Sequence, residues 1–441
     1  MARHRKQLPE QPFSAVITDL SNDGRGVGRL DGKTVFIQGG LPGEELTFTL
    51  NDRHRHYDEG TAHEILQPAP DRVTPRCPHF GTCGGCALQH LAPASQIDFK
   101  QSALRENLRR VGKVEPEAWL PSLKGPVWAY RRKARLSVRW VAKKERVLVG
   151  FRERYGRFVT DCRECHVLVP ELGFRLGEFA ELIGTLDSYR RIPQLEVACG
   201  DNLNVVVIRH LDPLSSGDRE KLVAFEGQSG LRILLQAKGP DSVRPLTDEP
   251  LQLRYKFQDH DIELQFNAQN FIQINAEINH QIVNRILELL APDREHKVLD
   301  LYCGLGNFTL PVARYAGRVT GVEGDPLLVE QAKANAASNG LPNTGFHSAD
   351  LNLPDPQSNW LRQGYDKVIL DPPRSGAQAM LAHLPATGAS QILYISCHPS
   401  SLARDAGILV NELGYKLAAA AVMDMFPHTA HVESMALFER R

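Results

Sequence analysis

A short apolar run followed at once by a glycine-rich turn constrains the fold of this chain more than any other feature. Residues 297–301 have the character of a buried strand, and the turn contains Tyr302, Gly304, Gly306 and Asn307. A second apolar run ends at Glu323, nineteen residues after Gly304. An acid at that place can accept hydrogen bonds from both hydroxyls of a ribose. The pattern therefore predicts an α/β sheet that binds a nucleoside-type cofactor.

The glycine spacing also bears on which cofactor binds. A dinucleotide site has a third glycine packed inside the following helix, whereas here Gly304 and Gly306 lead directly into Asn307. S-adenosylmethionine has no pyrophosphate to hold, so we expect this cofactor. A plain turn between a strand and a helix is the alternative reading of the same residues.

Length and charge say less about function. A chain of 441 residues is too long for one ordinary core, so we expect several domains. The 52 basic and 52 acidic side chains cancel, so only local charge can indicate a partner. No run approaches the roughly 20 apolar residues of a membrane span, and the start of the chain lacks the core of a signal peptide. We therefore expect no membrane contact and a cytoplasmic location.

The N-terminal part has the turn-rich pattern of a small all-β domain. After a basic tail over residues 1–10, short runs at 34–38 and 44–50 predict strands within residues 11–70. Their number and spacing favour a five-stranded barrel of the oligonucleotide-binding type. The loop at 53–57 carries two arginines, two histidines and a tyrosine, which could contact RNA phosphates or simply be solvated.

Three cysteines crowd into ten residues at Cys77, Cys83 and Cys86, and Cys162 and Cys165 follow much later. Glycines between the first three let the backbone curl so that the sulfurs converge. Four thiolates suit either an iron-sulfur cluster or zinc, and three clustered cysteines plus a remote one favour a cubane cluster. Reduced cysteines without any metal are the alternative.

The stretch between residues 130 and 157 is strongly basic, with eleven Lys or Arg against two Glu, and five aromatic residues are interspersed. Cations hold phosphates and aromatic rings stack on bases, so this segment predicts contact with RNA or DNA rather than a merely solvated face. A helix with Ile97, Leu104, Leu108 and Val111 on one face precedes it, and mostly antiparallel strands at 196–210 and 230–266 follow. We expect residues 71–290 to form a central α+β domain.

Two further strands in the C-terminal part end at polar residues. The run at 367–370 leads into Asp371 and two prolines, and the run at 391–395 leads into Ser396 and Cys397. Working residues of open α/β sheets lie beyond the carboxyl ends of the strands, so Cys397 is suitably placed for a nucleophile. A free cysteine is more commonly a small core residue, and Cys397 alone does not decide the matter.

Four motifs together resemble the RNA uracil-C5 methyltransferases, namely residues 300–310, 371–374, 396–399 and 426–434. With the N-terminal barrel, which looks like a TRAM domain, and the cysteines, the chain is similar end to end to the bacterial 23S ribosomal RNA branch. The resemblance implies a Rossmann-like methyltransferase domain over residues 291–441. It implies Cys397 as the nucleophile and Glu433 as the general base. Two departures are His398, where the family usually has Asn, and Ala430, where it usually has Gly.

The resemblance also implies the other ligands. An S-adenosylmethionine site would be lined by Gln273, Tyr302, Asn307, Glu323, Asp350 and Asp371. A [4Fe-4S] cluster would be held by Cys77, Cys83, Cys86 and Cys165, the last preferred to Cys162 because of its family-like Cys-x-x-Leu run. The expected substrate is a uridine of 23S ribosomal RNA, of the uracil-1939 type, and the expected state is a monomer.

Other functions remain open from the sequence. The chain could methylate another ribosomal position or a tRNA. An adenine-directed enzyme is less favoured because Arg374 stands where such enzymes have an aromatic residue. In a different class, it could be a non-catalytic RNA-binding factor of ribosome assembly, although Cys397 and Glu433 are both present.

Overall fold

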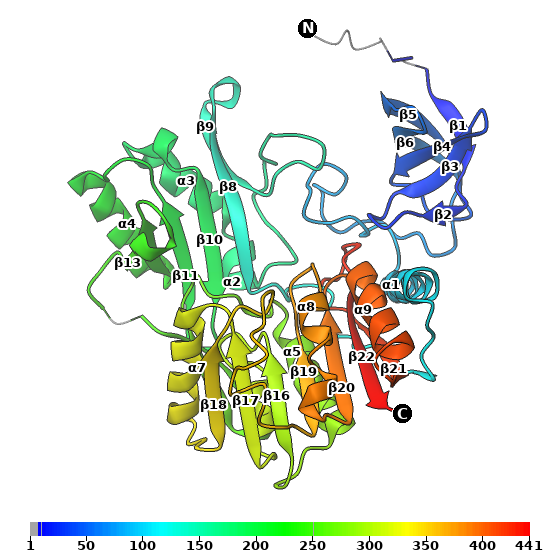
Figure 1. Cartoon of the computed structure of the whole chain (residues 1–441). Helices are drawn as coiled ribbons and strands as arrows, with labels where there is room; N and C mark the ends of the chain where they lie inside the picture. The colour runs from blue at the N-terminus through cyan, green and yellow to red at the C-terminus, as the bar shows by residue number, and fades with distance from the viewer. Residues whose placement is uncertain (1–7, 10, 250) are drawn as a thin grey trace, which may run out of the picture. The chain divides into compact units, whose positions relative to one another are not determined.

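The computed structural model describes residues 8–9, 11–249 and 251–441, so most of the predicted basic tail lies outside the described residues (Figure 1). The chain forms two compact units. The first unit contains residues up to Lys100 together with Arg152–Thr160 and Phe426–His431, and the second contains Gln101–Phe151, Asp161–Met425 and Val432–Arg441. Within the described ranges, every helix is too short or too polar to span a bilayer.

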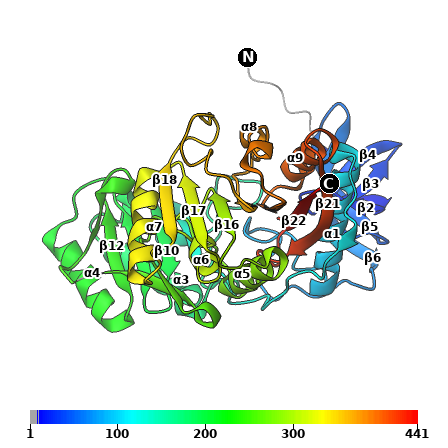
Figure 2. The ribbon, with the colours of Figure 1, turned by 60° about the horizontal axis from the view of Figure 1, so that its bottom comes forward.

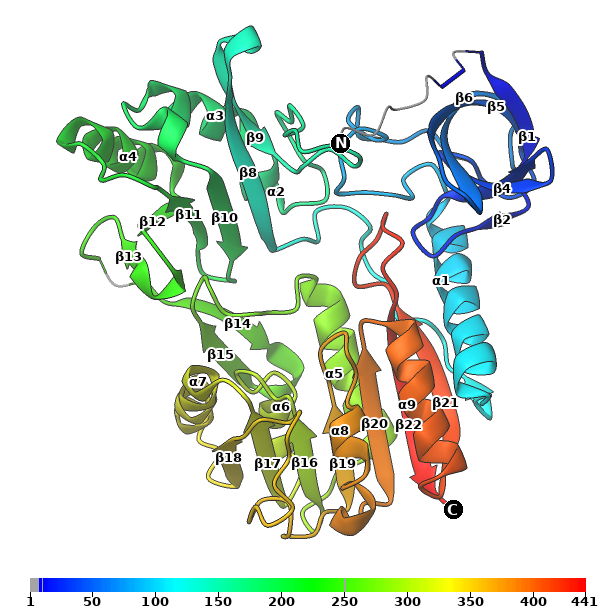
Figure 3. The same cartoon turned by 45° about the horizontal axis from the view of Figure 1, so that its top comes forward.

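The first unit is built on a sheet of six strands, which curls around its apolar core (Figure 3). The core includes Val35, Ile37, Leu46 and Phe48, all fully buried. The expected all-β fold is therefore confirmed, with a two-residue sixth strand in addition to the five expected. The strands, in the order β1-β5-β6-β4-β3-β2, are β1 (Phe13–Val16), β2 (Asp19–Leu20), β3 (Gly26–Leu30), β4 (Lys33–Gln38), β5 (Glu45–Arg53) and β6 (Tyr57–Gln67).

A buried carboxylate fixes the chain that leaves this sheet. Glu44 is fully buried and accepts hydrogen bonds from the Arg72 guanidinium and from the backbone amides of Leu41 and Ala69. Burial by itself raises the pKa of Glu44, but the bonds from Arg72 and the two amides hold the pKa below its usual value. The pair thus ties residues 41–44 to residues 69–72.

Helix α1 (Pro93–Asn107) forms where the apolar spacing predicts a helix, and a π-helical turn, Leu108–Gly112, extends it. Ile97, Leu104 and Leu108 are buried as expected, but Val111 is 50% exposed. The prediction for Val111 is wrong because the π turn holds more residues per turn than an α-helix and rotates this side chain out of the buried face.

The second unit begins with a central six-stranded sheet, ordered β13-β12-β11-β10-β8-β9. The predicted antiparallel pairing is confirmed for β10 with β11 and for β12 with β13, but β12 pairs parallel with β11. The antiparallel pairs of β8 with β9 and β10 complete the sheet. The sequence reading missed α4, the crossover helix that makes a parallel neighbour possible. The elements are β8 (Lys133–Val141), β9 (Arg146–Gly150), α2 (Pro170–Gly173), α3 (Leu176–Thr185), β10 (Gln194–Cys199), β11 (Asn204–Arg209), α4 (Ser216–Ser229), β12 (Arg232–Gln236) and β13 (Val243–Pro245).

A hairpin of β14 (Leu253–Phe257) and β15 (Ile262–Phe266) leads to helix α5 (Ala276–Leu290) and then to a sheet of eight strands. Its order is β18-β17-β16-β19-β20-β22-β21-β7, in which β16 to β20 are parallel and β22 is antiparallel to β20. The strands are β7 (Ala118–Trp119), β16 (Lys297–Leu301), β17 (Arg318–Glu323), β18 (Thr344–Ser348), β19 (Lys367–Leu370), β20 (Gln391–Ser396), β21 (Tyr415–Met423) and β22 (Glu433–Arg440).

Helices cover both faces of this sheet. Figure 2 shows α8 and α9 on one side and α5 and α6 on the other. The predicted strands at 297–301, 318–322, 367–370 and 391–395 are confirmed to within one residue. The α/β architecture expected for the C-terminal part is therefore present. The remaining helices are α6 (Thr309–Ala313), α7 (Pro326–Ser338), α8 (Gln378–Leu381) and α9 (Pro399–Asn411).

Candidate active site

The predicted site residues lie in strand order along one edge of the eight-stranded sheet. Tyr302 follows β16, Glu323 ends β17, Asp371 follows β19, and Cys397 follows β20. Asp350 comes two residues after β18. These strands are parallel, so their carboxyl ends meet at the same edge and bring the five side chains to one side of the sheet.

The two residues assigned to chemistry lie at the ends of neighbouring strands, Cys397 just after β20 and Glu433 at the start of β22. Ser396, the last residue of β20, is paired with Ser434 of β22 in antiparallel register, and the Ser434 hydroxyl donates to the Ser396 carbonyl at 3.3 Å. The ladder between the two strands ends at this pair, and Cys397 and Glu433 are the neighbouring residues at its end. The Glu433 carboxylate raises the pKa of the Cys397 thiol, so the two groups lie close enough to interact through their charges.

The surroundings of Cys397 favour the neutral thiol. Burial, with the carboxyl groups of Glu433 and Asp371 adding to it and the Arg374 guanidinium opposing it, raises the pKa of this thiol to about 11. Burial also raises the pKa of Asp371 well above its usual value, with Glu433 and Asp300 adding to the effect. A thiol with this pKa keeps its proton at neutral pH, so forming the thiolate requires a change in the charges around it.

His398 serves as a helix cap. Its ring Nδ1 lies 3.4 Å from the Ser401 amide and 2.9 Å from the Ser401 hydroxyl, at the start of α9. Its own backbone amide donates to the Ser396 hydroxyl. Asn is a preferred N-cap, so His398 can replace the family's usual Asn in this capping role.

The glycine turn and Glu323 are in direct contact. The Glu323 carboxylate accepts hydrogen bonds from the amides of Gly304, at 3.1 Å, and Asp325, at 3.0 Å. Tyr302, which begins the turn, has a left-handed φ of 65°, a conformation that is costly for a bulky residue and often marks functional sites. Gly306 has φ 96°, and a Cβ there would lie 2.3 Å from a methyl carbon of Leu310, so the turn requires glycine at this position.

The remaining cofactor candidates have different settings. Asn307 exchanges hydrogen bonds with Asn279 and accepts one from the Tyr255 hydroxyl. Gln273 lines a narrow cavity together with Tyr255 and Asn279. Asp350 is exposed, and its carboxylate contributes to raising the pKa of the Tyr302 phenol, for which burial is the main cause. Gln273 and Asn307 thus have two neighbours in common, Tyr255 of β14 and Asn279 of α5, and both of these elements precede β16 in the chain.

Two buried acids near the site were missed by the sequence analysis. Asp300 lies in the middle of β16, and burial raises its pKa to about 7 despite hydrogen bonds from Thr309. Asp405 of α9 accepts from the Tyr394 hydroxyl and from the Ala377 amide, and so anchors the loop that begins at Asp371. An acid inside an apolar strand was a visible signal for Asp300, whereas the contacts of Asp405 have no local signature.

The cysteines predicted to hold a metal lie in loops. Gly85 donates its amide to the Cys83 sulfur at 3.4 Å, and Gly81 has a left-handed φ of 90°, as expected for a backbone that curls. The Cys165 amide donates to the Gly173 carbonyl at 2.7 Å, and Cys162 is buried. Across the described ranges, no three His, Cys, Asp or Glu side chains are arranged to hold a metal ion. The cluster is therefore not confirmed and stays a prediction.

The basic segment is less positive in the fold than in the sequence. Four of its eleven cations have acidic partners. These pairs leave a smaller excess of charge available for phosphates than the sequence count suggests. The pairs are Arg132 with Asp201, Arg135 with Glu196, and Lys144 and Arg146 with Asp161.

Comparison with known families decides between the classes of enzyme that this geometry allows. The family model described as tRNA (Uracil-5-)-methyltransferase matches residues 203–349 and 360–441, more than half of the chain. The chain belongs to this family. A TRAM domain model matches residues 13–62, within the curled sheet of the first unit. The methyltransferase and TRAM parts of the resemblance are confirmed.

Relatives and solved structures agree with this assignment. The 23S rRNA (uracil(1939)-C(5))-methyltransferase RlmD of Xanthomonas euvesicatoria pv. vesicatoria is 51% identical over 444 residues, and that of Stenotrophomonas maltophilia is 50% identical, each with 100% of both chains covered. The crystal structure of Pyrococcus abyssi tRNA (uracil-54, C5)-methyltransferase in complex with S-adenosyl-L-homocysteine has a TM-score of 0.73 at 24% identity and covers 97% of this chain and 100% of that one. At this identity the likeness establishes the fold.

Proposed function

We propose that this chain transfers a methyl group from S-adenosylmethionine to C5 of a uridine in 23S ribosomal RNA, at the position equivalent to uracil 1939. The observation that carries the proposal is that Cys397 and Glu433 lie beside the last residue pair of β20 and β22, in a chain 51% identical to an enzyme named for that activity. Ribosomes are assembled in the cytoplasm, so we propose this location for the enzyme. We also propose that it acts as a monomer.

The chemistry requires a nucleophile from the enzyme, because C5 of uracil is itself too weak a nucleophile to displace a methyl group from sulfur. The sulfur of Cys397 forms a bond to C6, and the C5–C6 double bond becomes an enolate with its electron density at C5. When bound, S-adenosylmethionine would supply the methyl group that C5 takes up, and S-adenosylhomocysteine would leave. Glu433 then removes the proton from C5, the C6–sulfur bond breaks, and the double bond is restored as the thiolate leaves.

The charges around Cys397 set the order of events. A thiol with a pKa of about 11 must give up its proton before its sulfur can bond to C6, and the charges of Glu433 and Asp371 oppose that loss. The Arg374 guanidinium is the cation that lowers the pKa of the thiol and would stabilise the thiolate. We assign Arg374 this supporting role beside the nucleophile.

We propose that the cofactor binds to residues at the carboxyl ends of the parallel strands. Glu323 is assigned to the ribose hydroxyls, and its two backbone hydrogen bonds hold the carboxylate beside the glycine turn. At Gly304, which has a left-handed φ of 54°, a Cβ would meet none of the described residues other than its chain neighbours within 4 Å, so this part of the turn leaves room for a nucleoside to approach the backbone. The other side chains assigned to S-adenosylmethionine are Gln273, Tyr302, Asn307, Asp350 and Asp371.

We also propose a [4Fe-4S] cluster on Cys77, Cys83, Cys86 and Cys165. The support is the spacing, the left-handed Gly81 and the amide that reaches the Cys83 sulfur. Purified protein should be brown, with iron and sulfide in near-equal amounts. Colourless protein that contains zinc would overturn this assignment, and replacement of Cys162 without loss of iron would exclude it as the fourth ligand.

The N-terminal barrel, its loop at 53–57 and the basic segment at 130–157 are proposed to hold the RNA. The target base must be unpaired or flipped out of its stack before Cys397 can reach C6. Two alternatives stay testable, namely another rRNA position or a tRNA, and a non-catalytic assembly factor. Mass spectrometry of ribosomal RNA from cells that lack the protein distinguishes the position.

The central experiment traps the intermediate. Glu433→Gln keeps the size and hydrogen bonding of the side chain but cannot remove the C5 proton, so methylated RNA should stay attached to Cys397 and appear as a band of higher mass on a denaturing gel. Cys397→Ala is the control and should give neither band nor methylation. Methyl transfer by Cys397→Ala would refute the covalent mechanism, and no transfer by the wild type on any RNA would favour the assembly factor.

A further inference from the structure

A buried tyrosine outside the methyltransferase sheet reaches the cofactor turn. Tyr255 of β14 is 7% exposed, and its hydroxyl donates to Asn307 Oδ1 at 2.7 Å. Asn279 of α5 is 3% exposed and pairs with the same amide twice, through Nδ2 to Asn307 Oδ1 at 3.0 Å and through Oδ1 from Asn307 Nδ2 at 2.9 Å. Three hydrogen bonds thus fix the plane of the Asn307 amide.

These bonds determine what Asn307 can offer a ligand. Both lone pairs of its carbonyl oxygen are used, by Tyr255 and by Asn279, and one of its two N–H groups is donated to Asn279. One N–H remains in a fixed direction. Asn307 can therefore act toward the cofactor as a single oriented hydrogen-bond donor, which suits a carboxylate or hydroxyl oxygen.

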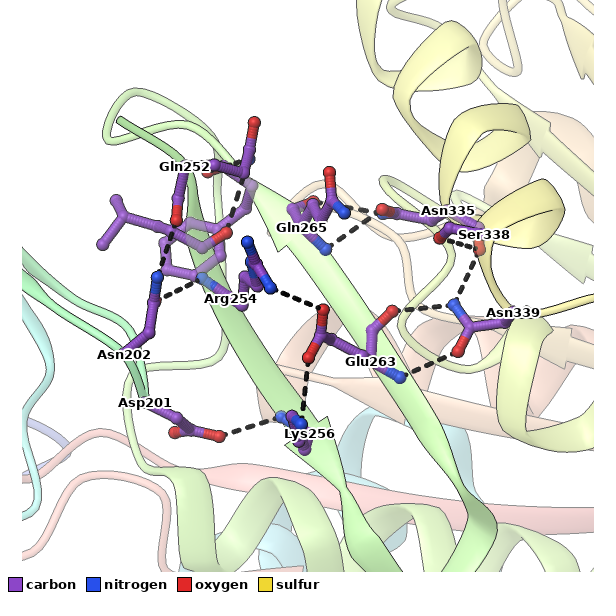
Figure 4. Close-up of polar contacts among 12 residues, drawn as sticks. Asp201, Asn202, Gln252, Arg254, Lys256, Glu263, Gln265, Asn335, Ser338 and Asn339 are labelled. Atoms are coloured by element: carbon purple, nitrogen blue, oxygen red, sulfur yellow. Dashed lines mark hydrogen bonds and ion pairs between the residues drawn. The ribbon is translucent and has the colours of Figure 1, made fainter. Parts of the chain in front are cut away.

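The strand that carries Tyr255 is itself held from the central sheet. The amides on either side of Tyr255, those of Arg254 and Lys256, donate to Asn202 Oδ1 at 3.0 Å and to Asp201 Oδ2 at 2.9 Å (Figure 4). The Asp201 amide donates back to the Arg254 carbonyl at 2.6 Å. The β10–β11 turn thus holds the backbone of β14 at the residue that contacts Asn307.

The second strand of the hairpin is held by two asparagines four residues apart, Asn335 in α7 and Asn339, which caps the end of that helix. Asn335 and Asn339 each bond both backbone groups of one residue of β15, Gln265 and Glu263 respectively, at 2.7–3.1 Å (Figure 4). Their amides act like a neighbouring strand for this edge. Asn335 also donates to the Leu305 carbonyl at 3.1 Å, inside the cofactor turn. The β14–β15 hairpin is therefore connected to both sides of Gly306.

We propose that Tyr255 and Asn279 are positioning residues for S-adenosylmethionine, which act by orienting Asn307, and that the β14–β15 hairpin is the brace of the cofactor turn. The inference rests on the cofactor site proposed above and adds residues that lie before the methyltransferase strands. It predicts that loss of the Tyr255 hydroxyl weakens cofactor binding and leaves the chemical step largely intact.

The test is Tyr255→Phe, which removes one hydroxyl from a buried ring. The KM for S-adenosylmethionine should rise roughly three- to tenfold, as expected for one net hydrogen bond, while kcat at saturating cofactor changes less than about twofold. Tyr415→Phe is the matched control, because Tyr415 is also buried and donates to the Ala389 carbonyl, away from Asn307. The control should leave the KM unchanged.

A double-mutant cycle separates positioning from general loss of stability. In an Asn307→Ala background, Tyr255→Phe should change the KM for S-adenosylmethionine less than about twofold, because the group it orients is absent. An equal effect in both backgrounds, or an unchanged KM in the single variant, would overturn the proposal. Wild-type protein that binds no S-adenosylmethionine in equilibrium dialysis would instead refute the proposed function.

Discussion

Replacing Asp300 by Asn should remove a pH dependence of stability that is built into the cofactor strand. Asp300 is fully buried in β16, and its Oδ1 atom has no hydrogen-bond partner among the described residues. Thr309 donates to the other oxygen. Burial raises the pKa of Asp300 to about 7 from an ordinary 3.8, so the folded protein keeps this carboxyl protonated under conditions where the unfolded chain ionises it.

The size of the effect follows from the two pKa values. A raised folded-state pKa contributes stability that is complete below the unfolded pKa and is lost as the pH rises through about 7. Between about pH 5 and pH 8 the loss for a single group is roughly 2.5 kcal/mol of unfolding free energy. Asn cannot ionise, so the Asp300→Asn variant does not lose stability in this way as the pH rises. The stability deficit of the variant relative to the wild type should therefore shrink toward higher pH, because only the wild type is destabilised by ionisation.

The assay is urea unfolding at several pH values. It is followed by the fluorescence of tryptophans that include Trp360, which is 4% exposed in the core that also contains Leu299 and Leu301 of β16. The difference in unfolding free energy between Asp300→Asn and the wild type should move by roughly 2.5 kcal/mol in favour of the variant from pH 5 to pH 8. Asp259→Asn, an exposed change of the same kind, should show no such trend. Parallel pH profiles for Asp300→Asn and the wild type would refute the reasoning.

Three other variants test single contacts. Glu433→Gln removes a carboxylate that raises the pKa of Cys397, so alkylation of this thiol by iodoacetamide at pH 8 should become faster by mass spectrometry, and an unchanged rate would contradict the assignment. Glu44→Gln leaves Arg72 without its charged partner and should lower the free energy of unfolding of the first unit, measured in urea, by about 3 kcal/mol. A variant as stable as the wild type would contradict this expectation. His398→Asn should keep the cap of α9, whereas His398→Ala should cost about 1 kcal/mol in thermal unfolding; equal loss in both would show that capping is not its role.

Local sequence patterns were sufficient to predict four strands of the eight-stranded sheet and to predict that the site lies at their carboxyl ends. Runs of apolar residues located β16, β17, β19 and β20, because a strand buried on both faces must be apolar along its length. Polar residues at the ends of such runs then fall on one edge, since parallel strands all point the same way. Tyr302, Glu323, Asp371 and Cys397 could therefore be grouped from the sequence without coordinates.

Features that depend on long-range pairing were beyond the sequence. The register of β20 with β22, which brings Cys397 and Glu433 to the end of the same strand pair, depends on two strands that meet only in the folded sheet. The same reason hides the partners of the basic segment, since the acids that neutralise Arg135 and Arg146 lie on other elements.

The sequence by itself determined strands β16, β17, β19 and β20, the glycine turn and the family motifs, because each is encoded by residues close together in the chain. Only the tertiary structure decided how the cofactor turn is held. Tyr255 meets Asn307 across 52 positions, in a hydrogen bond that no periodicity or spacing records. A buried polar group must find a partner wherever the packed chain provides one, and that choice is made by the fold as a whole.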